Sequence, residues 1–174
     1  MTDKREVWMR GPVADVPALL QPVAHSLLQT AEEVRACTIG FPDDQLWIKP
    51  NGMASVGFHL QHLRGILDRL FTYANGGSLT EQQLAYLASE GIENNESTTD
   101  LVKKIEEQVT LALQQLKQTR EDQLLQSRGI GRKKIPTTLI GLLFHAAEHA
   151  QRHAGQLLVT IRLLPLIQSR GNAE

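Results

Sequence analysis

Four long stretches of this 174-residue chain repeat apolar residues at helical spacing, and turn-forming residues separate them. The predicted helices run from Val16 to Cys37, from near Ser55 to the Gly76-Gly77 pair, from Thr99 to Gln118, and from Pro136 to Leu164. Pro22 lies inside the first stretch, so it either kinks that helix or marks its true start. Pro165 directly follows the last stretch and is predicted to end that helix.

The segments between these helices carry turn chemistry and no strong strand pattern. Residues 38–54 hold two prolines, two glycines and an Asn-Gly pair, which predicts a loop. Thr80 followed by Gln83 is a capping box that predicts a short helix ending near Gly91. Residues 120–134 are predicted to form a polar connection. The expected fold is therefore all-α, an antiparallel four-helix bundle with one short extra helix, in a single domain over residues 1–174.

The charge balance and the terminal sequences exclude several classes of partner. Lys and Arg number 18 against 19 Asp and Glu, so the net charge is −1 and no global basic field attracts nucleic acid or an anionic membrane. Cys37 is the only cysteine, so no disulfide can form within the chain. The first residues lack the apolar core of a secretory signal, and the most apolar stretch, 157–167, is too short to span a bilayer. We therefore expect a cytoplasmic protein.

Three of the six histidines lie at four-residue intervals in the last predicted helix. Each four-residue step turns a helix by about 40°, so His145, His149 and His153 form one strip along its surface. Apolar positions such as Leu143 lie just beside this strip, which places the imidazoles at the edge of the core. The same helical projection places Glu148 on the opposite side, where we expect solvent.

His59 and His62 form a second group, in the segment HLQHL of the second predicted helix. They lie on or next to the apolar face of that helix, with His62 nearer its polar edge. If this helix and the last one face each other in the bundle, four or five imidazoles converge at their interface.

Two interpretations of this convergence stay open. In the first, each inward histidine is a core residue whose ring nitrogens bond to protein groups, and this is our interpretation of His25, which stands alone in the first helix. In the second, neutral imidazoles hold a divalent cation, which avoids the repulsion among several protonated rings. Two histidines one turn apart, with a third from a facing helix, suit a three-His site with positions left for water.

The four-helix pattern, the HLQHL segment and the H-x3-H-x3-H-x-GQ segment together resemble the DinB-like superfamily. This superfamily includes YfiT-type metal-dependent hydrolases and thiol S-transferases. The resemblance extends from the first helix to Leu164. It implies that His62, His149 and His153 are the metal ligands, because they match the family's motif. The chain has Ala154 directly after the last of them, where the family often has arginine.

The same resemblance implies that His59 and His145 are neighbours of the site, which either support a ligand or face a substrate. Gln156 lies on the histidine strip, where it either orients a bound molecule or bonds across the bundle. The basic segment from Arg128 to Lys134 is interpreted as solvated loop or as a cationic rim for an acidic substrate. The sequence identifies no general base, so no catalytic residue is predicted.

The function implied by the resemblance is that of a metal-dependent enzyme with zinc or nickel as its metal. It would transfer a low-molecular-weight thiol to an electrophile or hydrolyse a small substrate. The expected partner is that small molecule, and the bundle could also pair through a helix face into a homodimer. Two other functions stay open: a non-catalytic metal-binding stress-response protein, and a structural bundle whose histidines serve packing or dimer formation.

Overall fold

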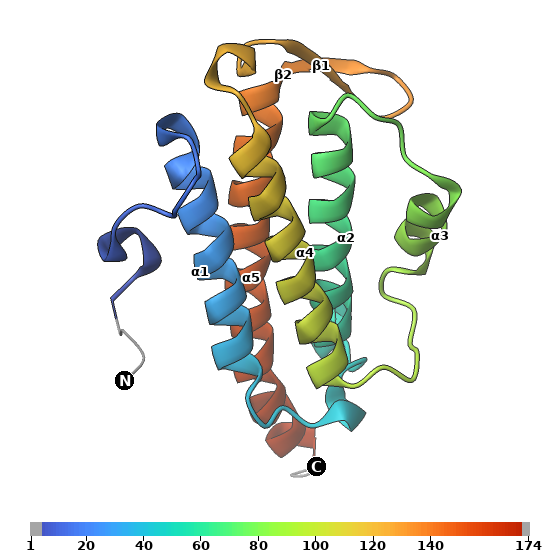
Figure 1. Ribbon diagram of the computed structural model, residues 1–174. Helices are drawn as coiled ribbons and strands as arrows, with labels where there is room; N and C mark the ends of the chain where they lie inside the picture. The colour runs from blue at the N-terminus through green and yellow to red at the C-terminus, as the bar shows by residue number, and fades with distance from the viewer. Residues whose placement is uncertain (1–4, 172–174) are drawn as a thin grey trace.

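Within residues 5–171, which the structure describes, the computed structural model contains five α-helices and one β-hairpin (Figure 1). Its described side chains extend to residue 165. The helices are α1 Gln21–Thr38, α2 Val56–Ala74, α3 Glu81–Ser89, α4 Thr98–Gln118 and α5 Leu139–Gly171. The hairpin pairs β1 Ser127–Ile130 with β2 Ile135–Thr138, in antiparallel orientation. The predicted helical bundle with one short extra helix is confirmed.

The four long helices form a square in which each packs mainly against two neighbours. α2 packs against α5 and α4, and α1 packs against the same two helices (Figure 1). α2 and α5 run antiparallel, but α2 and α4 run in the same direction, because the 75–97 connection returns the chain to its starting end. Gln115, late in α4, accordingly donates to the carbonyl of Phe71, late in α2, at 3.0 Å. The predicted antiparallel arrangement therefore holds for α2 and α5 but not for α2 and α4.

The hairpin occupies a segment that the sequence predicts as a polar connection followed by the start of a helix. Ser127 pairs with Thr138, so residues 136–138 belong to a strand and not to the last helix. The two-stranded ribbon tolerates Pro136 because an edge strand does not need every N–H group. Gly131, at φ +67°, begins the tight turn between the strands. Each strand has only four residues, so an alternation of apolar and polar residues is too short to identify it from the sequence.

Two helix boundaries also differ from the prediction at prolines. α1 begins at Gln21 and not near Val16, and Pro22 lies in its first turn, where a missing N–H costs no hydrogen bond. The alternative in which Pro22 marks the true start of this helix is therefore confirmed. α5 does not end before Pro165 but continues to Gly171. The φ of proline is close to the helical value, so Pro165 costs α5 a backbone hydrogen bond without reversing the chain. Despite this length, no helix among the described residues is apolar enough over a sufficient span to cross a membrane.

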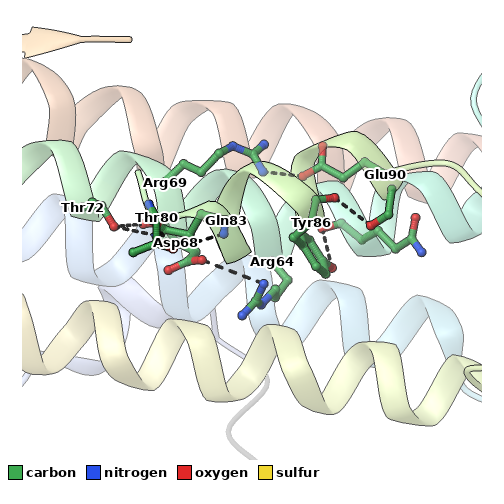
Figure 2. Close-up of polar contacts among 10 residues, drawn as sticks. Arg64, Asp68, Arg69, Thr72, Thr80, Gln83, Tyr86 and Glu90 are labelled. Atoms are coloured by element: carbon green, nitrogen blue, oxygen red, sulfur yellow. Dashed lines mark hydrogen bonds and ion pairs between the residues drawn. The ribbon is translucent and has the colours of Figure 1, made fainter. Parts of the chain in front are cut away.

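The core lies along the centre of the square, and α3 lies outside it. Fully buried leucines from each long helix fill the centre, among them Leu27, Leu63, Leu116 and Leu143. α3 runs beside α2 and buries none of its side chains (Figure 1). Polar contacts attach it to α2: the Tyr86 hydroxyl donates to the Gln61 carbonyl at 3.1 Å, and the Arg64 guanidinium lies 4.4 Å above the Tyr86 ring (Figure 2).

Candidate metal site

Three imidazoles from two facing helices meet at the interface of α2 and α5. His62 comes from the second turn of α2, and His149 and His153 lie one turn apart on α5. One nitrogen of each ring lies within 4.8 Å of the other two, in a group that could hold a metal ion. The ring centroids of His62 and His153 are 4.4 Å apart. The structure thus brings together the three residues that the resemblance implies as ligands.

Glu90 orients the ring of His62. Its Oε2 lies 2.7 Å from Nδ1 of His62, and a carboxylate can only accept a hydrogen bond. Nδ1 therefore carries a proton, and Nε2 faces the cluster, 3.1 Å from Nε2 of His149. A carboxylate on the outer nitrogen is the usual arrangement for a histidine that binds a metal through its other nitrogen.

Arg69 of α2 holds the same carboxylate. Its Nη1 donates to Oε1 of Glu90 at 2.5 Å, and Figure 2 shows its side chain reaching along α2 toward Glu90. The side chains of Arg69 and Glu90 are only 6% and 5% exposed. A buried ion pair is favourable only when further hydrogen bonds satisfy both groups, and His62 takes the second carboxylate oxygen. Gly65 leaves the necessary space, because a Cβ there would overlap Glu90 and Arg69.

Burial keeps the imidazoles of His149, His153 and His59 uncharged. Desolvation is the main cause that lowers the pKa of His149 to about 4 and the pKa of His153 to about 3, and a charge on His62 lowers both further. Desolvation likewise lowers the pKa of His59 to about 4. These rings are therefore neutral at pH 7, and a neutral imidazole offers a lone pair to a cation.

The position of Nε2 of His149 suits a shared cation. Its Nε2 faces Nε2 of His62 at 3.1 Å, and two nitrogens bound to one tetrahedral zinc at about 2.0–2.1 Å lie roughly 3.3 Å apart. Its Nδ1 is buried and has no hydrogen-bond partner among the described residues. Structural and metal-binding histidines alike normally have a partner at this nitrogen, so the spacing of the two Nε2 atoms is the observation that points to a shared cation.

His59 lies directly against His153. The two Nδ1 atoms are 3.1 Å apart, and His59 is 4% exposed. This contact occupies Nδ1 of His153 and leaves its Nε2 for the cluster. His59 is thus a neighbour of the cluster that supports one of its rings.

His145 and Gln156 lie at the margins of the cluster. The His145 ring is 5.3 Å from that of His149, and its side chain is 43% exposed. Its Nδ1 lies 2.7 Å from Oε1 of Glu148, so the prediction that Glu148 faces away from the histidine strip is wrong. Residues three apart on a helix are neighbours, which is why the Glu148 side chain reaches back to His145. Gln156 is exposed and stays outside the three-ring group.

Sequence reasoning missed Glu90 and Arg69. Arg69 comes seven residues after His62, so it lies on the same face of α2 within the apolar segment LDRLF, and a charge there was a usable signal. Glu90 gave no such signal. Its position depends on where the 75–97 connection places the end of α3, which no local pattern determines.

The basic segment 128–134 and His25 lie away from the cluster. The basic residues 128–134 belong to the hairpin at the start of α5, about 15 Å along that helix from His149. Arg128 donates from Nε to the carbonyl of Ala74 at 2.7 Å, so it secures the hairpin to the end of α2. His25 bonds through Nε2 to the Gly11 carbonyl at 3.0 Å, in keeping with its structural interpretation.

Comparisons with known proteins identify the family. A solved crystal structure of a conserved protein from Enterococcus faecalis superposes with a TM-score of 0.65 at 18% sequence identity, covering 83% of this chain and 96% of that chain. At this identity the likeness concerns the fold alone. The search of curated proteins found no significant match. The family model of the DinB superfamily matches residues 23–157, a span that contains all three clustered histidines. The chain therefore belongs to the DinB superfamily.

Proposed function

We propose that the protein is a metal-dependent enzyme in which His62, His149 and His153 hold a divalent transition metal. Its reaction is the transfer of a low-molecular-weight thiol, or of water, to a small electrophilic substrate. The convergence of the three imidazoles, one of them oriented by the buried Glu90, is the observation that carries this function. Imidazole ligands suit zinc and nickel alike, so both metals enter the test.

The residues of the chain provide orientation, and burial keeps two of the three donor rings, His149 and His153, neutral. Glu90 fixes the tautomer of His62, and His59 contacts the ring of His153 from the other side. A metal held by these three ligands would have positions left for a water or thiol, and it would lower the pKa of that group. In the thiol reaction the S–H bond breaks and an S–C bond forms. The leaving group departs with its bonding electron pair and receives the proton, and hydrolysis balances in the same way with water.

Metal content tests the ligand set. Untagged wild type, His62→Ala and His153→Ala are each loaded with zinc or nickel, desalted and subjected to elemental analysis. We expect about one metal per chain in wild type and none in either variant. His25→Ala is the control and should keep its metal, because His25 bonds to Gly11 outside the cluster. If the wild type retains neither metal, the proposed metal site is contradicted and the histidines have a structural role.

Turnover tests the enzymatic function. The metal-loaded protein is incubated with pairs of low-molecular-weight thiols and electrophiles, and separately with hydrolysable esters and amides. We expect product in one of these series, lost after chelation and lost in His153→Ala. A protein that holds one metal per chain and converts none of these substrates would be the non-catalytic metal-binding protein instead.

A further inference from the structure

A pocket of about 600 Å³ opens beside the histidine cluster, between α5 and the turn that precedes α2. Its walls are largely apolar and include Met53, Val159 and Leu163. Sites for small organic molecules usually have volumes of roughly 300–1,000 Å³, with apolar walls and a few polar groups. None of the three clustered rings lines this pocket, so it is a space distinct from the candidate metal site.

His59 separates the pocket from the cluster. It lines the pocket on one side, and its Nδ1 lies 3.1 Å from Nδ1 of His153 on the other. A molecule bound in the pocket is therefore one imidazole away from the rings of the candidate metal site. The pocket is therefore adjacent to the candidate metal site and separated from it by His59.

Two polar side chains of the pocket wall make no hydrogen bond to another described residue. Thr160 is 6% exposed, and its hydroxyl is not sealed in the core, because Nδ1 of His149 is the only buried unpaired side-chain polar atom among the described residues. Gln156 is exposed. The hydroxyl of Thr160 and the amide of Gln156 can therefore bond to a molecule in the pocket.

Arg152 gives the pocket a positive charge. Its side chain is 52% exposed and pairs with Glu148 one turn earlier on α5. A guanidinium has five N–H donors, so this pair leaves donors for an anion. The described lining of the pocket contains no acidic residue to repel one.

We infer that this pocket binds a small amphipathic anion, an organic molecule with an apolar body and one negatively charged group that pairs with Arg152. Resting on the proposed function, this molecule is the electrophile that the thiol or water attacks. The apolar walls bind its body, and the free groups of Thr160 and Gln156 bind its polar atoms. The chemistry excludes polycations and strongly hydrated sugars as preferred occupants.

Two fluorescent probes test this inference directly. 1-Anilinonaphthalene-8-sulfonate has an apolar body and one sulfonate, and N-phenyl-1-naphthylamine has the same body without the charge. Each is titrated into the folded full-length protein, both metal-loaded and chelated, and the dissociation constant is measured by fluorescence. Circular dichroism on the same samples verifies that every variant is folded.

Gly155 provides the variant that fills the pocket. A Cβ at this position meets no atom within 4 Å, so a larger side chain enters open space without disturbing α5. We expect Gly155→Leu to weaken both probes at least about tenfold, while the small Gly155→Ala changes them by less than about twofold. Unchanged binding of both probes to Gly155→Leu would overturn the assignment of the pocket.

Arg152 provides the variant that removes the charge. We expect Arg152→Gln to weaken the sulfonate probe about tenfold, the usual effect of losing a hydrogen bond to a charged group, and to leave the neutral probe unchanged. Arg162→Gln, at an exposed position on the same helix outside the pocket lining, should change neither. Equal loss of both probes in Arg152→Gln would overturn the anionic preference. Metal content, measured separately, shows whether the proposed function fails on its own.

Discussion

Nδ1 of His62 and Oε2 of Glu90 lie 2.7 Å apart, although 28 positions separate the two residues along the chain. His62 lies on α2 in the wall of the bundle, whereas Glu90 immediately follows α3, a helix that buries none of its side chains. The orientation of one clustered ring thus depends on an element outside the core. This dependence makes Glu90 an informative residue to change.

We expect Glu90→Gln to weaken metal binding about 10- to 100-fold, the usual cost of losing a carboxylate that orients a metal-binding histidine. The amide keeps the shape of the side chain but loses the charge that Arg69 and His62 share. Competition against a chelating dye measures the affinity. Glu93→Gln, at an exposed position on the same connection, is the matched control and should bind like wild type. Equal affinities for the two variants would show that Glu90 does not orient His62.

Two helical glycines should respond to alanine with opposite signs. We expect Gly65→Ala to destabilise the fold by about 2 kcal/mol, because its Cβ would overlap the buried pair of Glu90 and Arg69. Gly155→Ala should stabilise the fold by roughly 0.5–1 kcal/mol, because it restricts the unfolded chain and meets open space. Urea unfolding of the chelated protein measures both. A neutral Gly65→Ala would mean that the Glu90–Arg69 pair can move aside without cost.

Metal binding should raise the thermal stability of the protein. A ligand at about 100 times its dissociation constant adds about 2.7 kcal/mol by mass action, which for a chain of this size raises Tm by roughly 5–10 °C. We expect this rise in wild type and in His25→Ala, and its absence in His62→Ala. Differential scanning calorimetry with and without chelator measures the shift. A rise of the same size in His62→Ala would place the metal elsewhere.

Acid should destabilise the metal-free protein through its buried imidazoles. The folded-state pKa values of His59 and His149 are about 4 and that of His153 is about 3, below the ordinary value of 6.5. Below pH 6.5 these three histidines are therefore protonated in the unfolded chain and still neutral in the folded chain. The stability from neutral burial is fully present above about pH 6.5 and is lost as the pH falls toward about 4 and then 3.

Urea midpoints of the chelated protein, measured at about pH 7 and about pH 4.5, check this loss. His153→Gln removes one titrating ring, so we expect its midpoint to fall less between the two conditions than that of wild type. An identical fall in both proteins would mean that His153 does not contribute to the acid sensitivity.

The clustered histidines could be predicted because their convergence depends almost entirely on local geometry. His149 and His153 share a face of one helix by their spacing, and His62 lies beside the apolar face of another. A single long-range assumption was needed, that the two helices face each other, and the packing of α2 against α5 bears it out. The capping box of Thr80 and Gln83 was equally local, and α3 begins where it predicts.

The features that escaped prediction depend on contacts between distant segments. The hairpin forms from two four-residue strands, and one of them contains Pro136, which local propensity counts against a strand. Glu90 acquires its role only when the 75–97 connection places it between His62 and Arg69. Glu148 was misplaced for a different reason: a helical projection describes Cα directions, while a flexible carboxylate reaches a neighbour three residues back.

The peripheral position of α3 bears on how an ion enters and leaves the cluster. A helix without buried side chains detaches at a lower free energy than any of the long helices, so it opens more often. An opening that also breaks the buried Glu90–Arg69 pair would withdraw Glu90 and free the His62 ring to rotate while the core stays folded. The rate at which the metal dissociates would then follow the rate of local opening of α3 and not the rate of global unfolding. Faster exchange of the amide hydrogens of residues 81–89 than of those in α2 would show this local opening of α3.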